Sequence, residues 1–485
     1  MSDIGLSIAG SGLAADAAEI DTISNNLSNI DTAGYATEQV NLSPDAANGP
    51  FGAGQGVLIG SITNVTDAVF SAANVAAQGV SSQANQFSQV MSSIESIFPE
   101  PSSNGISSQL TSLWSAISTL ASNPNQVGAE QAAVSAAQSV ASSISSSFSQ
   151  LSQLSSSLQS QVGSGSNDGG LLTESNNLLS QIATLNAGIV EGRSGGQNPN
   201  ALSDQVTNDV NKLATLLGAN AVTQSNGTST VYLNGVQLVS GTVAQSLLAS
   251  GSAATTNLAV TTGDGVVVSA GGSIGANVTA VNTTIPDYMD QLNGVADSLA
   301  TNLNSLQASG MDAAGDPGST IAGGYAGTIL PPIFVNNGSS NSYTMASGAF
   351  NSAATIEVAP ALLASASLIA TAAAPGPTNS NQLGTATLDG SNAQAMAALA
   401  ALPSGPDATY HTLIGALGNQ AASASAFSTM ANGQAQSAAN NLSSISGVNE
   451  NNEEVALMAA QNAFQATSQV VNAINQSFQS LLSAV

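Results

Sequence analysis

The stretch IGLSIAGSGLAADAAEIDTISNNLSNIDTAGY, residues 4–35, repeats apolar side chains at intervals of seven. The repeat consists of two series: Leu6, Leu13, Ile20 and Leu27, and Ala9, Ile23 and Ile30. Only Asp16 interrupts it. A helix with such a heptad stripe buries the stripe against another helix. Asparagines such as Asn25 and Asn26 lie between stripe positions and can bond to nearby backbone, and Gly34 can adopt a positive φ, so we predict that the helix stops there.

The C-terminal stretch carries a second stripe of the same period. Its two series are Leu457, Phe464, Val471, Phe478 and Val485, and Ala460, Thr467, Ile474 and Leu481. Glu453 and Glu454 occupy the predicted first turn, where the helix dipole favours negative charge. A heptad helix alone buries nothing. Two of them at opposite ends of one sequence predict that the ends meet in a coiled coil, while the middle of the chain projects outward.

Charged residues are scarce and almost all acidic. The chain of 485 residues has 28 Asp and Glu but only Arg193 and Lys212 as basic residues, which gives a net charge of −26 at pH 7. Without a cationic surface, we expect neither nucleic-acid binding nor binding to anionic lipid. Hydrophobic residues make up 42% of the chain, enough for sizeable cores. With only 6% charged residues, the surface must be polar through Ser, Asn, Gln and Thr.

Few residues could support catalysis or metal binding. The chain has no cysteine, which excludes thiolate metal sites, disulfides and cysteine nucleophiles. His411 is the only histidine, and we interpret it as a structural or surface residue because no relay partner positions it. Asp312 and Asp316 resemble the opening of a calcium loop, but Ala314 stands at a ligand position and no glutamate closes the loop, which favours a turn. We predict no enzyme activity, no cofactor and no metal.

Helical spacing dominates the middle of the chain. Ala, Ser and Gln cover the outer faces of apolar-periodic segments at 65–98, 106–121 and 129–190. The Gly-rich run at 163–170 predicts a break or kink in the last of these. Together the segments predict a bundle of long helices.

The period changes to two near residue 220. The pair Asn234-Gly235 stands between β-branched runs and predicts a hairpin, and 263–272 predicts a turn with a further strand. Helical pattern returns at 286–306, and a Gly-, Pro- and Ala-rich stretch follows until about residue 389. Helix then resumes towards the C-terminal stripe.

These segments predict a mainly α protein with a β-rich insertion: a long-helix bundle, paired N- and C-terminal heptad helices, and a small β domain inserted in the middle. The predicted domains are 1–40 with 444–485 as a terminal coiled-coil assembly domain; 41–217 with 285–310 and 390–443 as the long-helix bundle; 218–284 as the β-rich domain; and 311–389 as an irregular or β insertion.

The terminal segments at 10–43 and 444–485 resemble the two ends of bacterial flagellar axial proteins, and the run Asp-Thr-Ala-Gly-Tyr is nearest to the hook-filament junction family. Two interior blocks are similar to the same family where its helical domain passes into its β domain. They are NPNALSDQVTNDVNKLATLLGANAV at 198–222 and TSTVYLNGVQLVSG at 228–241. The resemblance covers about half of the chain in the right order.

The resemblance implies a structural adaptor of the bacterial flagellum that forms the junction between hook and filament by helical self-assembly. Implied partners are further copies of the chain, the hook protein, the second junction protein and an export chaperone. The family leaves the cell through the flagellar type III channel, which fits a sequence without a secretory signal or a membrane-spanning run. Ala36, Thr37 and Val206 stand where the family usually has basic residues, so any salt bridge made there is in question.

We expect the terminal stripes to form the assembly interface. The expected residues are Leu6, Leu13, Ile20, Ile23, Leu27, Ile30, Leu457, Phe464, Val471, Ile474, Phe478 and Leu481. The stripes could instead be ordinary bundle core. Another axial protein (hook, rod or flagellin), a secreted coiled-coil adhesin or an enzyme remain alternatives in function.

The scarcity of basic residues also bears on the surroundings. Besides the amino terminus, only Arg193, Lys212 and His411 can carry positive charge in strong acid, so acid creates little self-repulsion in this chain. We therefore expect an extracellular protein that tolerates an acidic medium, with compositional drift as the alternative.

Overall fold

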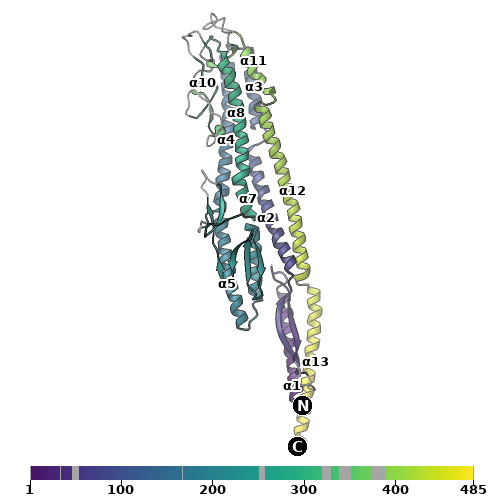
Figure 1. Ribbon diagram of the computed structural model, residues 1–485. Helices are drawn as coiled ribbons and strands as arrows, with labels where there is room; N and C mark the ends of the chain where they lie inside the picture. Colours follow the sequence, from purple (N-terminus) through teal and green to yellow (C-terminus); the bar gives the residue numbers. More distant parts are fainter. Residues whose placement is uncertain are drawn as a thin grey trace.

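The computed structural model describes residues 2–32, 34–45, 54–165, 168–250, 257–318, 329–337, 351–373 and 388–483. The molecule is elongated, and both chain termini lie at the same end (Figure 1). The first helix α1 (Ser2–Ser28) and the last helix α13 (Glu450–Ser483) pack against each other there. The predicted fold class, mainly α with small β insertions and long helices at both ends, is confirmed.

Long helices form the body of the molecule. They are α2 (Ala68–Ile97), α3 (Ile106–Ser122), α4 (Val127–Val162), α8 (Ile285–Ser309) and α12 (Pro406–Ser446). Their apolar stripes meet in one core that includes Leu113, Ile144 and Leu299. Helix α2 begins at Ala68 because the carboxylate of Asp67 accepts hydrogen bonds from the first free backbone N–H groups of the helix.

The predicted break at 163–170 is confirmed. Helix α4 ends at Val162, and Gly163 adopts φ +77°. The Asp168 carboxylate accepts hydrogen bonds from the N–H of Ser164 and of Gly170 and from the Thr173 hydroxyl. These bonds close the turn before α5 (Leu171–Ser194) begins.

Two antiparallel sheets follow helix α6 (Asn200–Leu217). The first contains β3 (Asn220–Thr223), β4 (Ser229–Leu233), β5 (Val236–Ser240) and β6 (Val243–Ala244) in that order. The second contains β7 (Leu247–Ser250), β8 (Ala259–Thr262) and β9 (Val267–Val268). Asn234 and Gly235 both have positive φ, at 46° and 85°, as a two-residue hairpin turn of type I′ requires. The hairpin predicted from this pair is confirmed.

The helical segment that contains Pro286 begins before this proline, at Gly272. Helix α7 (Gly272–Thr279) continues through a π-helical turn η1 (Ala280–Thr284) into α8. A proline inside a regular helix clashes with the carbonyl four residues before it, and the wider π turn accommodates Pro286 without ending the helix. The helical pattern predicted from Pro286 onward therefore starts too late, since the chain is already helical before this proline.

A small sheet lies near the N-terminus, mostly within the range 41–217 that the sequence predicts as helix bundle. Strands β1 (Glu38–Pro44) and β2 (Val57–Asn64) form an antiparallel hairpin that packs against α1. The β-branched residues of VLIGSITN, Val57, Ile59, Ile62 and Thr63, are the strand signal in this sequence. The hairpin therefore belongs with the terminal helices (Figure 1).

The insertion at 311–389 consists of short elements at the far end of the molecule (Figure 1). Its described elements are β10 (Gly310–Met311), β11 (Phe334–Asn336), α9 (Ser352–Thr355), β12 (Ile356–Val358), α10 (Pro360–Ala364), η2 (Ala366–Leu368) and β13 (Ala372–Ala373). Helix α11 (Ser391–Ala397) and the turn η4 (Ala398–Ala401) lead into α12. Asp312 accepts hydrogen bonds from the N–H groups of Ala314 and Asp316, so the predicted turn is confirmed.

Helix α5 holds both sheets through asparagine side chains. Asn186 is fully buried, and its amide donates to the carbonyls of Ser229 (2.8 Å) and Gly241 (2.7 Å) while its oxygen accepts from the Ser229 N–H. Asn176 donates to the Leu247 carbonyl (2.8 Å) and accepts from the Leu247 N–H (2.7 Å). Each side chain replaces the hydrogen bonds that a neighbouring strand would supply.

We predict that Asn186→Asp destabilises the protein at pH 7 by about 2–4 kcal/mol, because a buried carboxylate cannot donate to the two carbonyls. Urea unfolding followed by circular dichroism measures the difference. Asn177→Asp is the matched control, since Asn177 is exposed on the same helix. Equal stabilities of the two variants would show that the Asn186 contacts are unimportant.

Candidate functional site: the terminal stalk and its junction with the bundle

The terminal helices α1 and α13 run antiparallel and form a stalk together with the β1–β2 hairpin (Figure 1). Small residues on α1 allow close approach: a Cβ added to Gly5 would stand 3.6 Å from the Ile474 side chain, and one added to Gly12 would stand 3.4 Å from Thr467. Ala460 on α13 is buried. The two helices are therefore in van der Waals contact along much of their length.

The C-terminal stripe is the protected face of α13. Ala460 is buried and the other described stripe positions are half-buried, while most of the intervening residues are exposed. The half-buried positions are Leu457, Phe464, Thr467, Val471, Ile474 and Phe478. The stripe thus packs against α1 of the same chain.

The N-terminal residues of the expected interface are less uniform. Ile23 is buried, whereas Leu13, Ile20 and Leu27 are half-buried. Leu6 and Ile30 remain exposed at 37% and 40%. The side chain of Leu481 lies outside the described residues. A role of these residues in contacts between subunits stays a prediction.

Both stripes contain one polar residue, and the structure joins the two. The Thr467 hydroxyl donates to the Asp16 carboxylate at 3.1 Å. Asp16 interrupts the N-terminal stripe and Thr467 stands in the C-terminal one. A single polar pair in an apolar seam favours one register of the two helices.

Sequence reasoning missed a second group of apolar residues on α13. Val455, Met458 and Val470 are exposed at 62%, 57% and 51%. They lie outside the heptad stripe and face away from α1. Their apolar character at exposed helix positions is the only signal that could have identified them.

The junction between stalk and bundle is organised around Asn26. Its amide donates to the Glu38 carbonyl (2.9 Å) and to the Glu453 carboxylate (3.1 Å), and its oxygen accepts from the Tyr35 hydroxyl (2.8 Å) and the Glu38 N–H (2.9 Å). This buried side chain joins α1, the start of β1 and the first turn of α13. Burial and the charge of Glu38 raise the pKa of Tyr35, so its hydroxyl remains a hydrogen-bond donor. The Asn-rich run that ends α1 therefore builds the junction.

Gly34 is required where the chain turns from α1 to the hairpin. Its φ is +79°, and a Cβ there would lie within 3 Å of the Asn208 side chain of α6. The positive φ predicted for Gly34 is confirmed, although α1 itself ends earlier, at Ser28. Any other residue would be strained by the positive φ, and its Cβ would displace the Asn208 side chain.

Helix α6 completes the junction with two further polar side chains. Asn200 donates to the Glu38 carboxylate (2.8 Å) and to the Ile62 carbonyl (3.2 Å). Asp204 accepts from the Asn64 amide at 2.5 Å and from the N–H of Ala36. The hairpin is thereby tied to the bundle at its open end.

The junction is acidic and lacks the expected cations. Ala36 and Val206, where the family resemblance led us to expect basic residues, are both buried. Among the described residues the one ion pair is Lys212 Nζ to Asp209 Oδ1, at 3.4 Å. Burial, together with the charge of Glu38, raises the pKa of Asp204 to about 6. The carboxyl of Asp204 is therefore stabilised in its protonated form.

No arrangement for catalysis is evident in this region. Among the described residues no cluster of His, Cys, Asp or Glu has the geometry of a metal site. His411 is exposed on α12, where it lowers the pKa of Asp407 against the larger effect of burial. None of the described helices is both long and apolar enough to cross a membrane.

Known proteins match this chain in three ways. Residues 91–321 match the model of the flagellar hook-associated protein FlgK helical domain, and residues 6–35 match the flagella basal body rod protein model. The flagellar hook-associated proteins 1 of Salmonella typhimurium and Salmonella typhi are each 33% identical to it over 128 residues. That match covers 26% of this chain and 23% of each relative.

A solved structure has the same fold. The flagellar hook junction protein FlgK from Burkholderia pseudomallei superimposes with a TM-score of 0.58 at 19% sequence identity. The superposition covers 78% of this chain and 100% of the other. At this identity the similarity concerns the fold.

An elongated subunit whose two ends pair in a helical stalk has the build of a flagellar axial protein. The rod-protein match over 6–35 lies within the N-terminal part of this stalk. The resemblance to the flagellar hook-associated protein 1 family, predicted from the sequence, is confirmed by the helical-domain match and by the two Salmonella relatives.

We predict that acid stabilises the junction. Because the pKa of Asp204 in the folded chain lies above the unfolded value of about 4, the folded state binds this proton more tightly. The contribution is fully present below about pH 4 and is lost as pH rises through 6. It amounts to about 1 kcal/mol after discounting for the partial exposure of Asp204.

Thermal melts of Asp204→Asn between pH 4 and 7 test this prediction. The substitution removes the titrating group, so the variant should lose part of the acid stabilisation of the wild type. Asp21→Asn, an exposed position on α1, is the control. An unchanged pH dependence in Asp204→Asn would contradict the assignment.

Proposed function

We propose that the protein is a structural adaptor of the bacterial flagellum that forms the junction between hook and filament. The observation that carries the proposal is the stalk, which extends from the bundle and presents exposed apolar residues on its outer side. Within a subunit the heptad seam holds the stalk together. Between subunits the outer side of the stalk meets neighbours.

The mechanism is mechanical. Each subunit uses one surface to contact the preceding subunit and a different surface to contact the following one. Such heterologous contacts generate a helical layer. The stalk, 1–40 with 444–485 and the hairpin, forms the inner wall. The bundle, the β-rich domain at 218–284 and the insertion at 311–389 fill the outer layer and accommodate the mismatch between hook and filament.

The partners follow from this position. They are further copies of the chain, the hook protein on one side and the second junction protein on the other, with an export chaperone before assembly. The protein acts outside the cell after export through the flagellar channel without a cleaved signal. Its role requires no chemistry, and we propose that it is not an enzyme.

A rod subunit is the second candidate, because the N-terminal segment matches the rod-protein model. Electron microscopy of flagella from a deletion strain distinguishes the two. Hooks without filaments support the junction role, whereas loss of both hook and filament supports a rod role. Normal filaments would contradict both.

The acidic surroundings expected from composition have physical support in several carboxyls. Burial raises the pKa of Glu130, Asp209, Asp312 and Asp407 as well as of Asp204. Such groups are more easily kept as neutral acids, and they favour the folded state at low pH. We predict that circular dichroism melts remain cooperative at about pH 2.5, and loss of the helical signal there would refute acid tolerance.

The stripe residues provide a direct test of the stalk. Phe464→Asp places a charge in the half-buried seam and should cost several kcal/mol locally, so the stalk opens and filaments are lost from a complemented deletion strain. Gln465→Asp adds the same charge at the exposed neighbouring position and should support filaments. Normal filaments with Phe464→Asp would show that assembly does not depend on the seam.

A further inference from the structure

One long face of the bundle carries no charge. Helix α2 has no charged residue between Asp67 and Glu95, and α12 has none between His411 and the end of the helix. These two helices pack side by side (Figure 1). In a chain with net charge −26, two copies repel each other except where their surfaces are neutral. The face formed by α2 and α12 is therefore suited to contact between copies.

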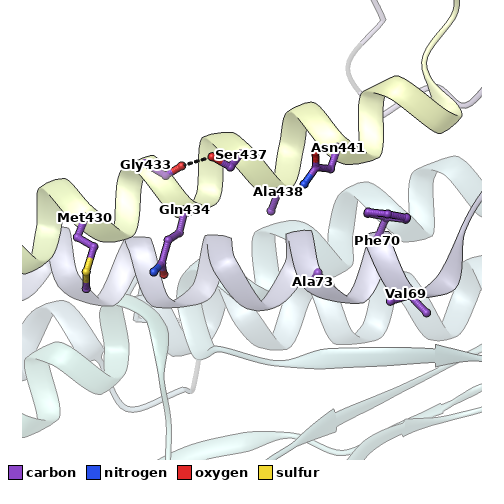
Figure 2. A pocket seen from close by; sticks show the side chains of 9 residues that line it. All are labelled: Val69, Phe70, Ala73, Met430, Gly433, Gln434, Ser437, Ala438 and Asn441. Carbon is purple, nitrogen blue, oxygen red and sulfur yellow. Dashed lines mark hydrogen bonds between the residues drawn. The ribbon is translucent and has the colours of Figure 1, made fainter.

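An apolar groove lies in this face, between the start of α2 and the later part of α12 (Figure 2). Its volume is about 470 Å³. The exposed side chains at its edge are Val69, Phe70 and Met430, at 75%, 37% and 52%. Ala73 and Gly433, whose side chains are small, leave room between the two helices.

The β1–β2 hairpin presents a complementary ridge. Leu42 and Ile59 are directly opposite each other across the two strands and therefore share one face. They are exposed at 42% and 44%. Beyond Glu38, neither strand contains a charged residue. A two-stranded hairpin is marginal alone, and covering its apolar ridge would stabilise it.

The ridge cannot reach the groove of its own chain. The open end of the hairpin adjoins the bundle, where Val65 N–H donates to the Thr37 carbonyl, and α2 starts three residues later. The strands run from there away from the bundle, since the Val57 N–H binds the Ser11 hydroxyl of α1. Ridge and groove are thus separated along the long axis by a distance on the order of 30 Å.

We infer that the groove between α2 and α12 receives the Leu42–Ile59 ridge of a neighbouring copy of this chain. Both surfaces are apolar and uncharged, one is convex and the other concave, and they occupy different levels of the same subunit. A contact of this kind is heterologous, so it can repeat from subunit to subunit. The inference rests on the self-assembly proposed above and assigns the surfaces that carry it.

Disulfide trapping tests the contact, because the wild-type chain has no cysteine. Full-length Ile59→Cys and Ala73→Cys chains, one with an affinity tag, are expressed together in the deletion strain. Flagella are isolated and oxidised with copper phenanthroline. A mixed disulfide between the two chains is expected at a level at least tenfold above that of either single variant. Val69→Cys, also at the groove, should give the same result.

The control pairs Ile59→Cys with Ser152→Cys in place of Ala73→Cys. Ser152 is exposed on α4, outside the groove, so this pair should give no mixed disulfide above the level of the single variants. Filaments on the hooks of the same cells show that the variants fold and that the proposed function holds. Filaments without the mixed disulfide overturn the inference alone, and so does a disulfide between two Ala73→Cys chains in place of the mixed one. Absence of filaments with the wild-type chain would instead count against the proposed function.

Discussion

Buried carboxamide side chains hold the parts of this molecule together. On α8, Asn304 accepts from the N–H groups of Ile333 and Phe334 and donates to the Phe334 carbonyl, and Gln307 binds the backbone of both Pro331 and Ala370. Asparagines on α5 hold the two sheets in the same way, and Asn26 joins the two ends of the chain. One amide group can donate and accept at once, so a single side chain satisfies both backbone groups of an irregular segment that has no adjacent strand. With few charged residues available, amides take the role that ion pairs have at many interfaces.

This choice of interaction determines how the molecule responds to pH. Amides do not titrate, so the contacts between amides and backbone that position the sheets and the insertion remain the same in acid. The carboxyls that do titrate are in several cases buried without a cation, and the folded state gains from their protonation. In a protein rich in salt bridges, acid would break the pairs and leave many uncompensated positive charges. Here Lys212–Asp209 is the one ion pair among the described residues, so little is lost.

The sequence was sufficient for features that depend on local pattern. The two heptad stripes, the break after Val162 and the turn at Asn234-Gly235 are each set by neighbouring residues, and each appears as predicted. The stalk hairpin was missed because Gly60 coincides with a register shift that disturbs the alternation of its second strand, and because the segment has no short turn signal. The junction could not be predicted, since Asn26, Asn200 and Asp204 meet only after α6 has been placed beside the hairpin. The sequence alone shows that Ala36 and Val206 are not basic. The raised pKa of Asp204 could not be predicted, because it depends on the burial of this carboxyl between α6 and the hairpin.

The location of the stripes has a consequence for how copies can associate. A stripe that already packs against α1 of its own chain cannot serve fully as the surface for a neighbour, because the same side chains cannot be buried twice. The proposed contacts between subunits would then use apolar residues that the folded chain leaves exposed, such as Val455 and Met458 on the stalk and Phe70 on the bundle. The seam and the outer residues thus have separate tasks. The seam, with its Asp16–Thr467 pair, fixes the shape of one stalk. On the bundle, the uncharged face of α2 and α12 would allow strongly acidic copies to come into contact, which 28 carboxyls distributed over every face would prevent.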